Sequence, residues 1–160
     1  FLLSEMKVLT FSKVFPQKHI NAGEPTNFKE KILSGEKIHT IRAATKNKKE
    51  YKFANCRFKI GDQISMRYWQ GKPYNSKQEI FCEDFEVKEI IKFRIKNNST
   101  IGFEINENNI WLDVFNQNEF LQLLSKNDGL TLDQFKSWFK FSNNMEEFFG
   151  YIIAWKPTNY

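Results

Sequence analysis

Strand-like alternation of apolar and polar residues recurs along the chain and is clearest over residues 63–70. Ile64, Met66 and Tyr68 occupy every second position there, which is the period of a strand with one buried face. Similar patterns predict strands over 6–11, 37–42, 79–96, 100–105 and 148–156. The segment 79–96 is either one long bent strand or two, and its apolar positions are Ile80, Cys82, Phe85, Val87, Ile91, Phe93 and Ile95.

Helical spacing predicts three short helices. The first has Phe28, Ile32 and Leu33 on one face, with Thr26 placed to cap it and Gly35 placed to end it. The apolar residues of the other two are Phe120, Leu121 and Leu124 in a helix ending near Asn127, and Phe135, Trp138 and Phe139 in a helix that begins with the capping box Thr131-Leu132-Asp133-Gln134.

These elements show no regular alternation of strand and helix, which favours an α+β fold. We expect a closed or nearly closed antiparallel β-barrel with about three short flanking helices, and residues 148–156 in the interior of the sheet. Residues 6–160 are expected to form a single domain. Residues 1–5 precede the first strand-like run at Met6 and are interpreted as an upstream remnant.

Composition excludes several classes of protein. The 160 residues include 17 Phe, 4 Trp and 5 Tyr, more aromatic residues than a disordered chain contains. No apolar run approaches the roughly 20 residues of a membrane span, so no membrane association is expected. The 2 cysteines do not form a multi-bridge framework and no signal-peptide pattern precedes them, which predicts a reducing cytoplasm.

Positive charge is concentrated in the first part of the chain. Residues 1–60 carry 13 Lys and Arg against 5 Asp and Glu, whereas the whole chain has a net charge of +5. This basic segment favours contact with a polyanion such as RNA. A solvated lysine-rich surface is the alternative interpretation, because 20 of the 24 basic residues are lysines.

The densest group of reactive side chains lies in the segment Gly35–Arg42, at the junction of the first helix and the next strand. Alternation places Thr40 and Arg42 on one face and His39 on the other. A lysine at position 37 that is close to Arg42 and partly desolvated has its neutral form favoured, as a general base requires. An ordinary strand end with solvated charges is the alternative.

This segment also resembles a known family. Residues 28–42 read F-K-E-K-I-L-S-G-E-K-I-H-T-I-R, which is similar to the signature of the ASCH domains, a branch of the PUA-like β-barrel superfamily. The shared pattern is a short helix, then Gly-x-Lys, then a strand that ends in arginine. Further similarities are the opening strand through Phe11 and Phe15, the segment Lys59-Ile60-Gly61-Asp62, residues 129–135 and the closing strand Tyr151 to Lys156.

The resemblance implies a small barrel with a cleft beside the Gly35–Arg42 strand, and a role with RNA, nucleosides or modified bases. One ASCH branch, the bacterial acetylcytidine amidohydrolases, removes an acetyl group from cytidine with a Lys, a Thr and a Glu. The matching residues here are Lys37, Thr40 and Asp128, where aspartate stands in the place of the glutamate. Many other ASCH members have an acidic residue at the position of Thr40.

A second cluster, residues 67–78, mixes basic and aromatic side chains as single-stranded nucleic-acid sites do. Its candidate contacts are Arg67, Trp69, Tyr74, Lys77 and Gln78. The alternative is a β-hairpin whose Tyr68 and Trp69 belong to the core and whose lysines protect an exposed edge. Residues 45–52 form a third basic element, a candidate backbone clamp or an ordinary solvated loop.

Metal and cofactor sites are not expected. Cys56, Cys82, His19 and His39 are isolated and lack the paired spacing of zinc ligands, and neither a P-loop nor a dinucleotide-binding motif is present. A nucleophile pair of Cys56 with His39 remains open because no motif supports or excludes it.

The leading hypothesis is an ASCH-domain protein, expected to be monomeric, that binds RNA or a modified nucleoside in a basic cleft beside the Gly35–Arg42 strand. Arg42 and His39 are its further ligand contacts. The enzyme alternative is an amidohydrolase that deacylates a cytidine-type nucleoside through Lys37, Thr40 and Asp128. The remaining alternative is a non-catalytic protein-interaction module.

Overall fold

The computed structural model of the chain describes residues 6–44, 56–96, 100–105, 108–113, 119–139 and 147–160. Two expectations lie outside these residues: the interpretation of residues 1–5 as an upstream remnant, and the basic element at 45–52 as a clamp. Within the described residues the fold is α+β, with eight strands in two sheets and three helices.

The smaller sheet has three strands in the order β1-β3-β4. They are β1 (Met6–Phe11), β3 (Gln63–Trp69) and β4 (Gln78–Glu86). β3 and β4 are antiparallel, but β1 runs parallel to β3, so the expectation of an entirely antiparallel sheet is wrong at this pair. A long connection that contains a helix and another strand separates β1 from β3, and such a crossover permits parallel pairing.

The larger sheet is antiparallel and has five strands in the order β2-β8-β5-β6-β7. They are β2 (His39–Ala43), β8 (Phe148–Ala154), β5 (Glu89–Ile95), β6 (Thr100–Ile105) and β7 (Asn108–Asp113). As predicted, the closing strand β8 lies inside the sheet, between β2 and β5. The sequence did not predict β7, because two asparagines begin it and asparagine is depleted in strands.

The segment 79–96 divides into β4 and β5, which belong to different sheets. The break falls at Val87, whose N–H donates to Asp62 O.

One predicted core position in β4, Ile80, is wrong. A bulge sets Cys82 opposite Met66 but Ile80 opposite Arg67. Adjacent residues of β3 point to opposite faces, so Ile80 follows Arg67 outward and is 51% exposed.

The helices α1 (Phe28–Ser34), α2 (Glu119–Asn127) and α3 (Leu132–Trp138) form where the spacing predicts them. The capping box of α3 is present, with Thr131 and Gln134 bonded reciprocally. The predicted cap of α1 is wrong, because Asn27 is its N-cap residue, without a side-chain hydrogen bond. Thr26 is buried instead, and its Oγ1 donates to Ser12 O at 2.8 Å.

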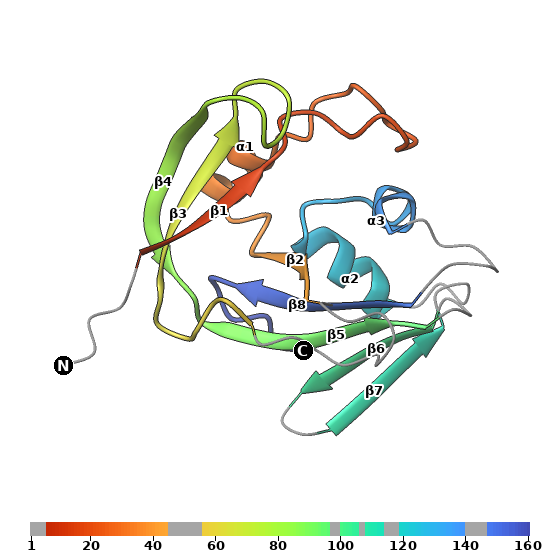
Figure 1. Cartoon of the computed structure of the whole chain (residues 1–160). Coiled ribbons are helices and arrows are strands. Elements are labelled where there is room, and N and C mark those ends of the chain that lie inside the picture. The colour runs from red at the N-terminus through yellow and green to blue at the C-terminus, as the bar shows by residue number, and fades with distance from the viewer. Residues whose placement is uncertain (1–5, 45–55, 97–99, 106–107, 114–118, 140–146) are drawn as a thin grey trace.

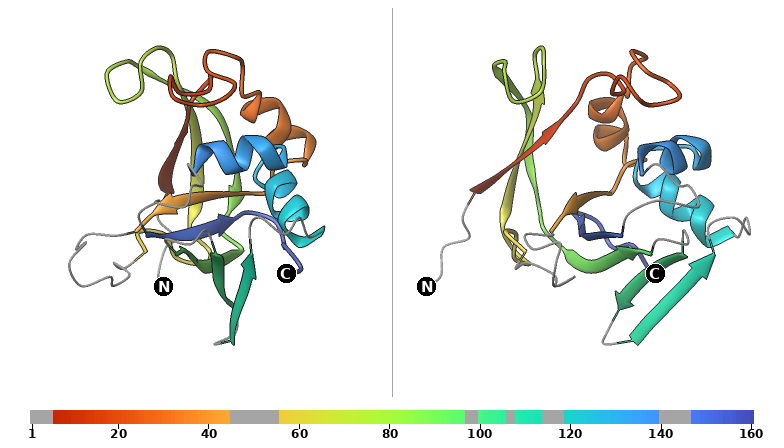
Figure 2. Two further views of the ribbon diagram at one scale, coloured as in Figure 1. Left: turned by 90° about the vertical axis from the view of Figure 1, so that its right-hand side faces the viewer. Right: turned by 45° about the vertical axis from the view of Figure 1, so that its right-hand side comes forward.

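The two sheets meet where β4 leads into β5; α2 and α3 lie on the side of the molecule away from β4, and α1 lies beside β1 and β3 (Figure 1 and Figure 2). No hydrogen-bonded pairing among the described strands joins the two sheets into one closed barrel. The core between them is contributed by both sheets and by the helices, and its members include Leu9, Ile32, Ile64, Phe93, Phe135 and Trp155. No helix in the described part of the chain is long and apolar enough to cross a membrane.

Candidate functional site

Lys37 lies where α1, α2 and β2 meet. Gly35 ends α1 with φ 84°, a left-handed conformation that glycine adopts without strain. The backbone then returns: Lys37 N–H donates to Lys31 O and Ile38 N–H donates to Asn127 O, each at 2.9 Å. The turn therefore directs the Lys37 side chain into the interior, where it is only 2% exposed.

The Lys37 amine contacts Asp128 through two acceptors. Nζ lies 2.5 Å from the Asp128 carbonyl oxygen and 3.2 Å from Oδ1. Burial lowers the pKa of Lys37 from 10.5 to about 8, even though the Asp128 carboxylate opposes this effect; Arg42 contributes to the lowering, as the sequence predicted. A neutral amine has two N–H donors, which match the two Asp128 acceptors, and its lone pair stays available to accept a proton.

The position of Asp128 depends on the residue that follows it. Gly129 has φ 77° and packs against the lysine, so that a Cβ there would lie 2.9 Å from Lys37 Cδ. A side chain at this position would therefore displace Lys37 or strain the backbone. The resemblance indicated Asp128 as the third catalytic residue, and the structure brings its side chain together with that of Lys37.

His39 lies next to Asp128, and Tyr160 lies next to His39. His39 Nδ1 is 3.4 Å from Asp128 Oδ1, which is long for a hydrogen bond, and Nε2 is 2.7 Å from Tyr160 Oη. Asn127 Nδ2 donates to the same Oη at 3.0 Å, so the phenol proton is free to be donated to Nε2. Burial lowers the pKa of His39 and raises the pKa of Tyr160. Both groups are therefore neutral near pH 7, and Nδ1 is the ring nitrogen that faces Asp128.

Replacing Tyr160 with phenylalanine is expected to lower the free energy of unfolding by about 1 to 3 kcal/mol, because two partly buried hydrogen bonds, each worth about 0.5 to 1.5 kcal/mol, lose their common partner. Tyr74→Phe is the matched control: Tyr74 is 78% exposed, so little change is expected. Urea denaturation of the two variants measures the difference. Equal stability of both variants would show that Tyr160 does not hold His39 in place.

A cavity of about 110 Å³, called the inner pocket, opens beside the lysine and the aspartate. Its lining includes Lys37, Thr40, Arg42, Trp69, Tyr74 and Asp128. The three residues that the resemblance assigned to catalysis therefore lie on one cavity. His39 is not among the lining residues, because it is fully buried behind Asp128.

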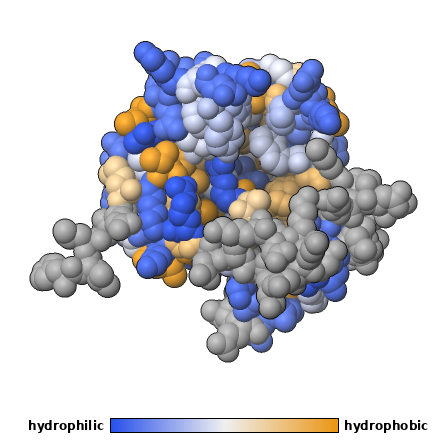
Figure 3. All heavy atoms as spheres, viewed as in Figure 1, coloured by the Kyte–Doolittle hydropathy of each residue, from blue (hydrophilic) through white to orange (hydrophobic). Residues whose placement is uncertain are grey.

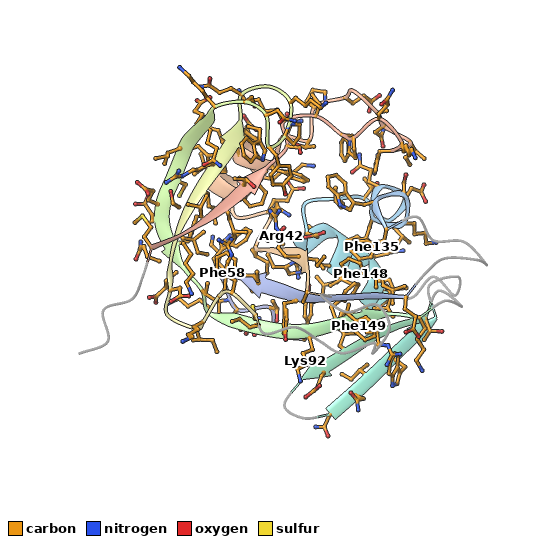
Figure 4. The ribbon with its side chains drawn as sticks, in the orientation of Figure 1. Arg42, Phe58, Lys92, Phe135, Phe148 and Phe149 are labelled. Atoms are coloured by element: carbon orange, nitrogen blue, oxygen red, sulfur yellow. The ribbon has the colours of Figure 1, made fainter. Side chains whose placement is uncertain are left out.

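A larger cavity of about 850 Å³, called the outer cleft, adjoins the inner pocket. Thr10, Arg42, Trp69 and Tyr74 line both cavities, and the outer cleft adds Arg57, Phe58 and Tyr151 among others. Figure 4 shows Arg42 and Phe58 between β1 and β8. Figure 3 shows a hollow near the middle of this face, with hydrophilic side chains in it and hydrophobic ones on either side.

The cluster 67–78 is a hairpin. Some of its residues line the cavities, as a binding site requires, and others belong to the core or to the exposed surface. Tyr68 is a core residue, but Trp69 and Tyr74 line the cavities with their ring centroids 5.1 Å apart. Gln78 lines the outer cleft, and it accepts a hydrogen bond from Arg67 at 3.1 Å. Arg67 and Lys77 line neither cavity, and Lys77 is exposed.

The other reactive groups have little support as part of the site. Burial raises the pKa of Cys56, which disfavours the thiolate, and the polar partners of His39 are Asp128 and Tyr160. In the described part of the chain, no cluster of three His, Cys, Asp or Glu could hold a metal ion. The pair of Cys56 with His39 thus gains no observation in its favour.

Sequence reasoning missed Tyr160, Trp138 and Arg57. Trp138 was interpreted only as a core residue of α3, but it also lines the inner pocket. Tyr160 follows the last predicted strand and had no pattern to mark it. Arg57 belongs to none of the motifs that the sequence offers, and its clearest signal was the positive charge of residues 1–60.

The inner pocket has the groups for proton transfer at a small polar substrate: a base in Lys37, a hydroxyl in Thr40 and a fixed cation in Arg42. The outer cleft adds aromatic faces and a second arginine. Comparison with known proteins adds no family to this description, since no protein-family model, no curated protein and no solved structure matches the chain.

Proposed function

We propose that this protein is an ASCH-type amidohydrolase that removes an acyl group from the exocyclic amine of a cytidine-type nucleobase. The observation that carries the proposal is the buried contact of Lys37 with Asp128 on the same cavity as Thr40. A lysine whose pKa is lowered to about 8 is partly neutral near neutral pH, so it can accept a proton. The sequence resemblance and the chemistry of the pocket thus support the same residues.

The reaction consumes one water and forms a carboxylate, the free nucleobase amine and one proton, which is released to solvent. Neutral Lys37 takes a proton from Thr40 or from a water, and the resulting nucleophile attacks the amide carbonyl. The tetrahedral intermediate collapses as the C–N bond breaks, and protonated Lys37 returns the proton to the leaving amine. If Thr40 attacks, water hydrolyses the acyl-threonine in a second, equivalent cycle.

Asp128 and Arg42 have supporting roles in this scheme. Asp128 holds Nζ in place through its two acceptors and stabilises the protonated lysine after the first step. The Arg42 guanidinium lines the same pocket and places a fixed positive charge beside the bound substrate. Trp69 and Tyr74 provide ring faces at the pocket for a planar base.

A PUA-like barrel is the fold that accompanies this proposal. The β2 strand that carries Thr40 and Arg42 lies at the edge of the larger sheet, and β1 lies at the edge of the smaller sheet. Arg42 connects these two edges through Thr10 O, which is compatible with a barrel left open on the side of the cleft.

The second candidate is a non-catalytic protein that binds RNA or a modified nucleoside in the same cavities. The aromatic pair Trp69 and Tyr74 favours it, because base stacking requires no catalytic group. Turnover separates the two candidates, since binding alone releases no product.

The test is turnover of acetylcytidine, followed by chromatography, with the unaltered protein and two variants of Thr40. We expect release of cytidine by the unaltered protein, substantial activity in Thr40→Ser, which keeps the hydroxyl, and a fall of about 100-fold or more in Thr40→Val. Absence of turnover by the unaltered protein would contradict the proposal. Equal activity of the valine and serine variants would remove Thr40 from the mechanism.

A further inference from the structure

The open edge of β1 is covered by two arginine side chains. β1 is an edge strand, and the carbonyls of Val8 and Thr10 accept hydrogen bonds from outside its sheet. Arg57 Nη2 donates to Val8 O at 2.8 Å, and Arg42 Nη2 donates to Thr10 O at 2.6 Å. Alternate carbonyls of a strand point the same way and lie about 6.7 Å apart. The two guanidinium groups therefore follow one another along the strand edge.

Both guanidinium groups are held in place without using all of their donors. The Arg42 guanidinium carbon lies 5.2 Å from the centre of the Phe11 ring, and that of Arg57 lies 4.7 Å from the centre of the Phe58 ring. A guanidinium has five N–H donors, of which each strand carbonyl takes one. Arg42 Nε is buried and has no hydrogen-bond partner among the residues that the structure describes.

The surroundings of the pair favour an anion. Both arginines line the outer cleft, and no carboxylate is among the described residues that line it. Burial is the main cause that lowers the pKa of Arg42; Tyr74 and the Asp128 carboxylate of the inner pocket oppose it, and the neighbouring charge of Arg57 adds to it. Two cations in one cleft whose described lining contains no carboxylate are suited to phosphate oxygens, which match the planar fork of arginine.

We propose that Arg42 and Arg57 bind successive phosphates of a single-stranded RNA, so that the substrate is a nucleotide within a strand. This inference rests on the proposed function for the base in the inner pocket. Arg42 lines both cavities and would contact the phosphate nearest to the reacting base, whereas Arg57 lines only the outer cleft and would contact the next phosphate. Trp69 and Tyr74, at the junction of the cavities, would stack against an unpaired base.

The first test compares three substrates on the unaltered protein: acetylcytidine, its monophosphate, and a short single-stranded RNA with acetylcytidine at its centre. The proposal predicts that kcat/KM rises along this series, by roughly tenfold for each phosphate contacted. It also predicts that the logarithm of the association constant for the RNA falls linearly with the logarithm of the salt concentration. The slope should be about −1.4, which is about −0.7 for each of two phosphates. Equal kcat/KM for the nucleoside and the RNA would overturn the proposal. Equal kcat/KM for the monophosphate and the RNA would overturn it too, because only one phosphate would then be bound.

The second test uses Arg57, which is exposed and outside the inner pocket. Arg57→Ala should raise KM for the RNA roughly tenfold more than it raises KM for the nucleoside, and it should reduce the salt slope by about 0.7. Arg57→Lys should recover only part of the loss, because an ammonium lacks the planar fork. Lys88→Ala is the control, since it removes one positive charge from an exposed site outside both cavities. If the arginines serve only to cover the strand edge, Arg57→Ala and Lys88→Ala will have the same KM for the RNA and the same salt slope of RNA binding, and the proposal fails.

A binding measurement separates this inference from the proposed function. Anisotropy of a fluorescently labelled RNA without the acetyl group reports the strand contact and needs no turnover. Binding that depends on Arg57, with no hydrolysis of any substrate, would uphold the phosphate contacts and contradict the amidohydrolase. Hydrolysis of acetylcytidine, with RNA binding that is insensitive to both salt and Arg57, would do the opposite.

Discussion

Replacing Lys37 with methionine is expected to lower kcat/KM for acetylcytidine by about 10² to 10⁴, the usual contribution of a general base. Methionine keeps much of the length and apolar surface of the lysine side chain but cannot accept a proton. Thr40 and Arg42 remain on the pocket, so binding should be affected less than the chemical step. Steady-state kinetics should therefore show most of the loss in kcat.

The same substitution is expected to destabilise the protein, because it leaves the Asp128 carboxylate buried without its cation. Loss of one partner of a buried pair costs about 3 to 5 kcal/mol. The double variant Lys37→Met/Asp128→Asn removes both charges and should recover much of this stability while remaining inactive. The two effects can thus be separated: stability returns in the double variant, and activity does not.

Lys31→Met is the matched control for Lys37→Met. Lys31 is nearby on α1 and donates to Gly129 O at 2.8 Å, but it does not line the inner pocket. Its variant should retain kcat within a few-fold of the unaltered protein. If Lys37→Met retains activity comparable to that of Lys31→Met while folded, Lys37 is not the base.

The second large effect is on the pH dependence of the reaction. kcat/KM should rise tenfold per pH unit below the Lys37 pKa of about 8 and become constant above it, because only the neutral amine accepts a proton. The rate at about pH 6 should therefore be roughly 100-fold below the plateau. Asp128→Asn removes a carboxylate that raises this pKa, so its residual activity should reach half of its plateau at a lower pH. A profile that is flat between about pH 6 and 9 would contradict a lysine base.

Stability provides a check on the same pKa that needs no activity. The pKa of Lys37 is about 8 in the folded protein and near 10.5 when the chain is unfolded. Between these values the unfolded state binds more protons, so this group makes the free energy of unfolding rise with pH. Denaturation of the unaltered protein and of Lys37→Met across this window isolates the effect. A difference between them that does not change with pH would show that the folded pKa is not lowered.

The sequence by itself determined the local elements. Gly35 ends α1 because it adopts the left-handed conformation without strain, and the capping box at Thr131 begins α3 through bonds within one turn. The alternation of Ile64, Met66 and Tyr68 similarly placed one face of β3 in the core. Each of these outcomes depends on interactions between residues close together in the chain.

Part of the candidate site could be predicted for the same reason. Lys37, Thr40 and Arg42 lie within six positions of one another at a helix-to-strand junction, so local geometry brings them together. Asp128 was found through the resemblance of its neighbours to a family, since no periodicity connects it to Lys37. Its contact with Lys37 joins positions that are 91 residues apart.

Only the tertiary structure decided the remaining features. The parallel pairing of β1 with β3, the bulge that turns Ile80 outward and the division of 79–96 between two sheets all depend on which strands become neighbours. Tyr160 contacts His39, which is 121 positions away in the chain, and Arg57 donates to the carbonyl of Val8, which is 49 positions away. Hydrophobic periodicity specifies which face of an element is buried but not the partner that covers it, so these contacts exist only once the two sheets have packed together.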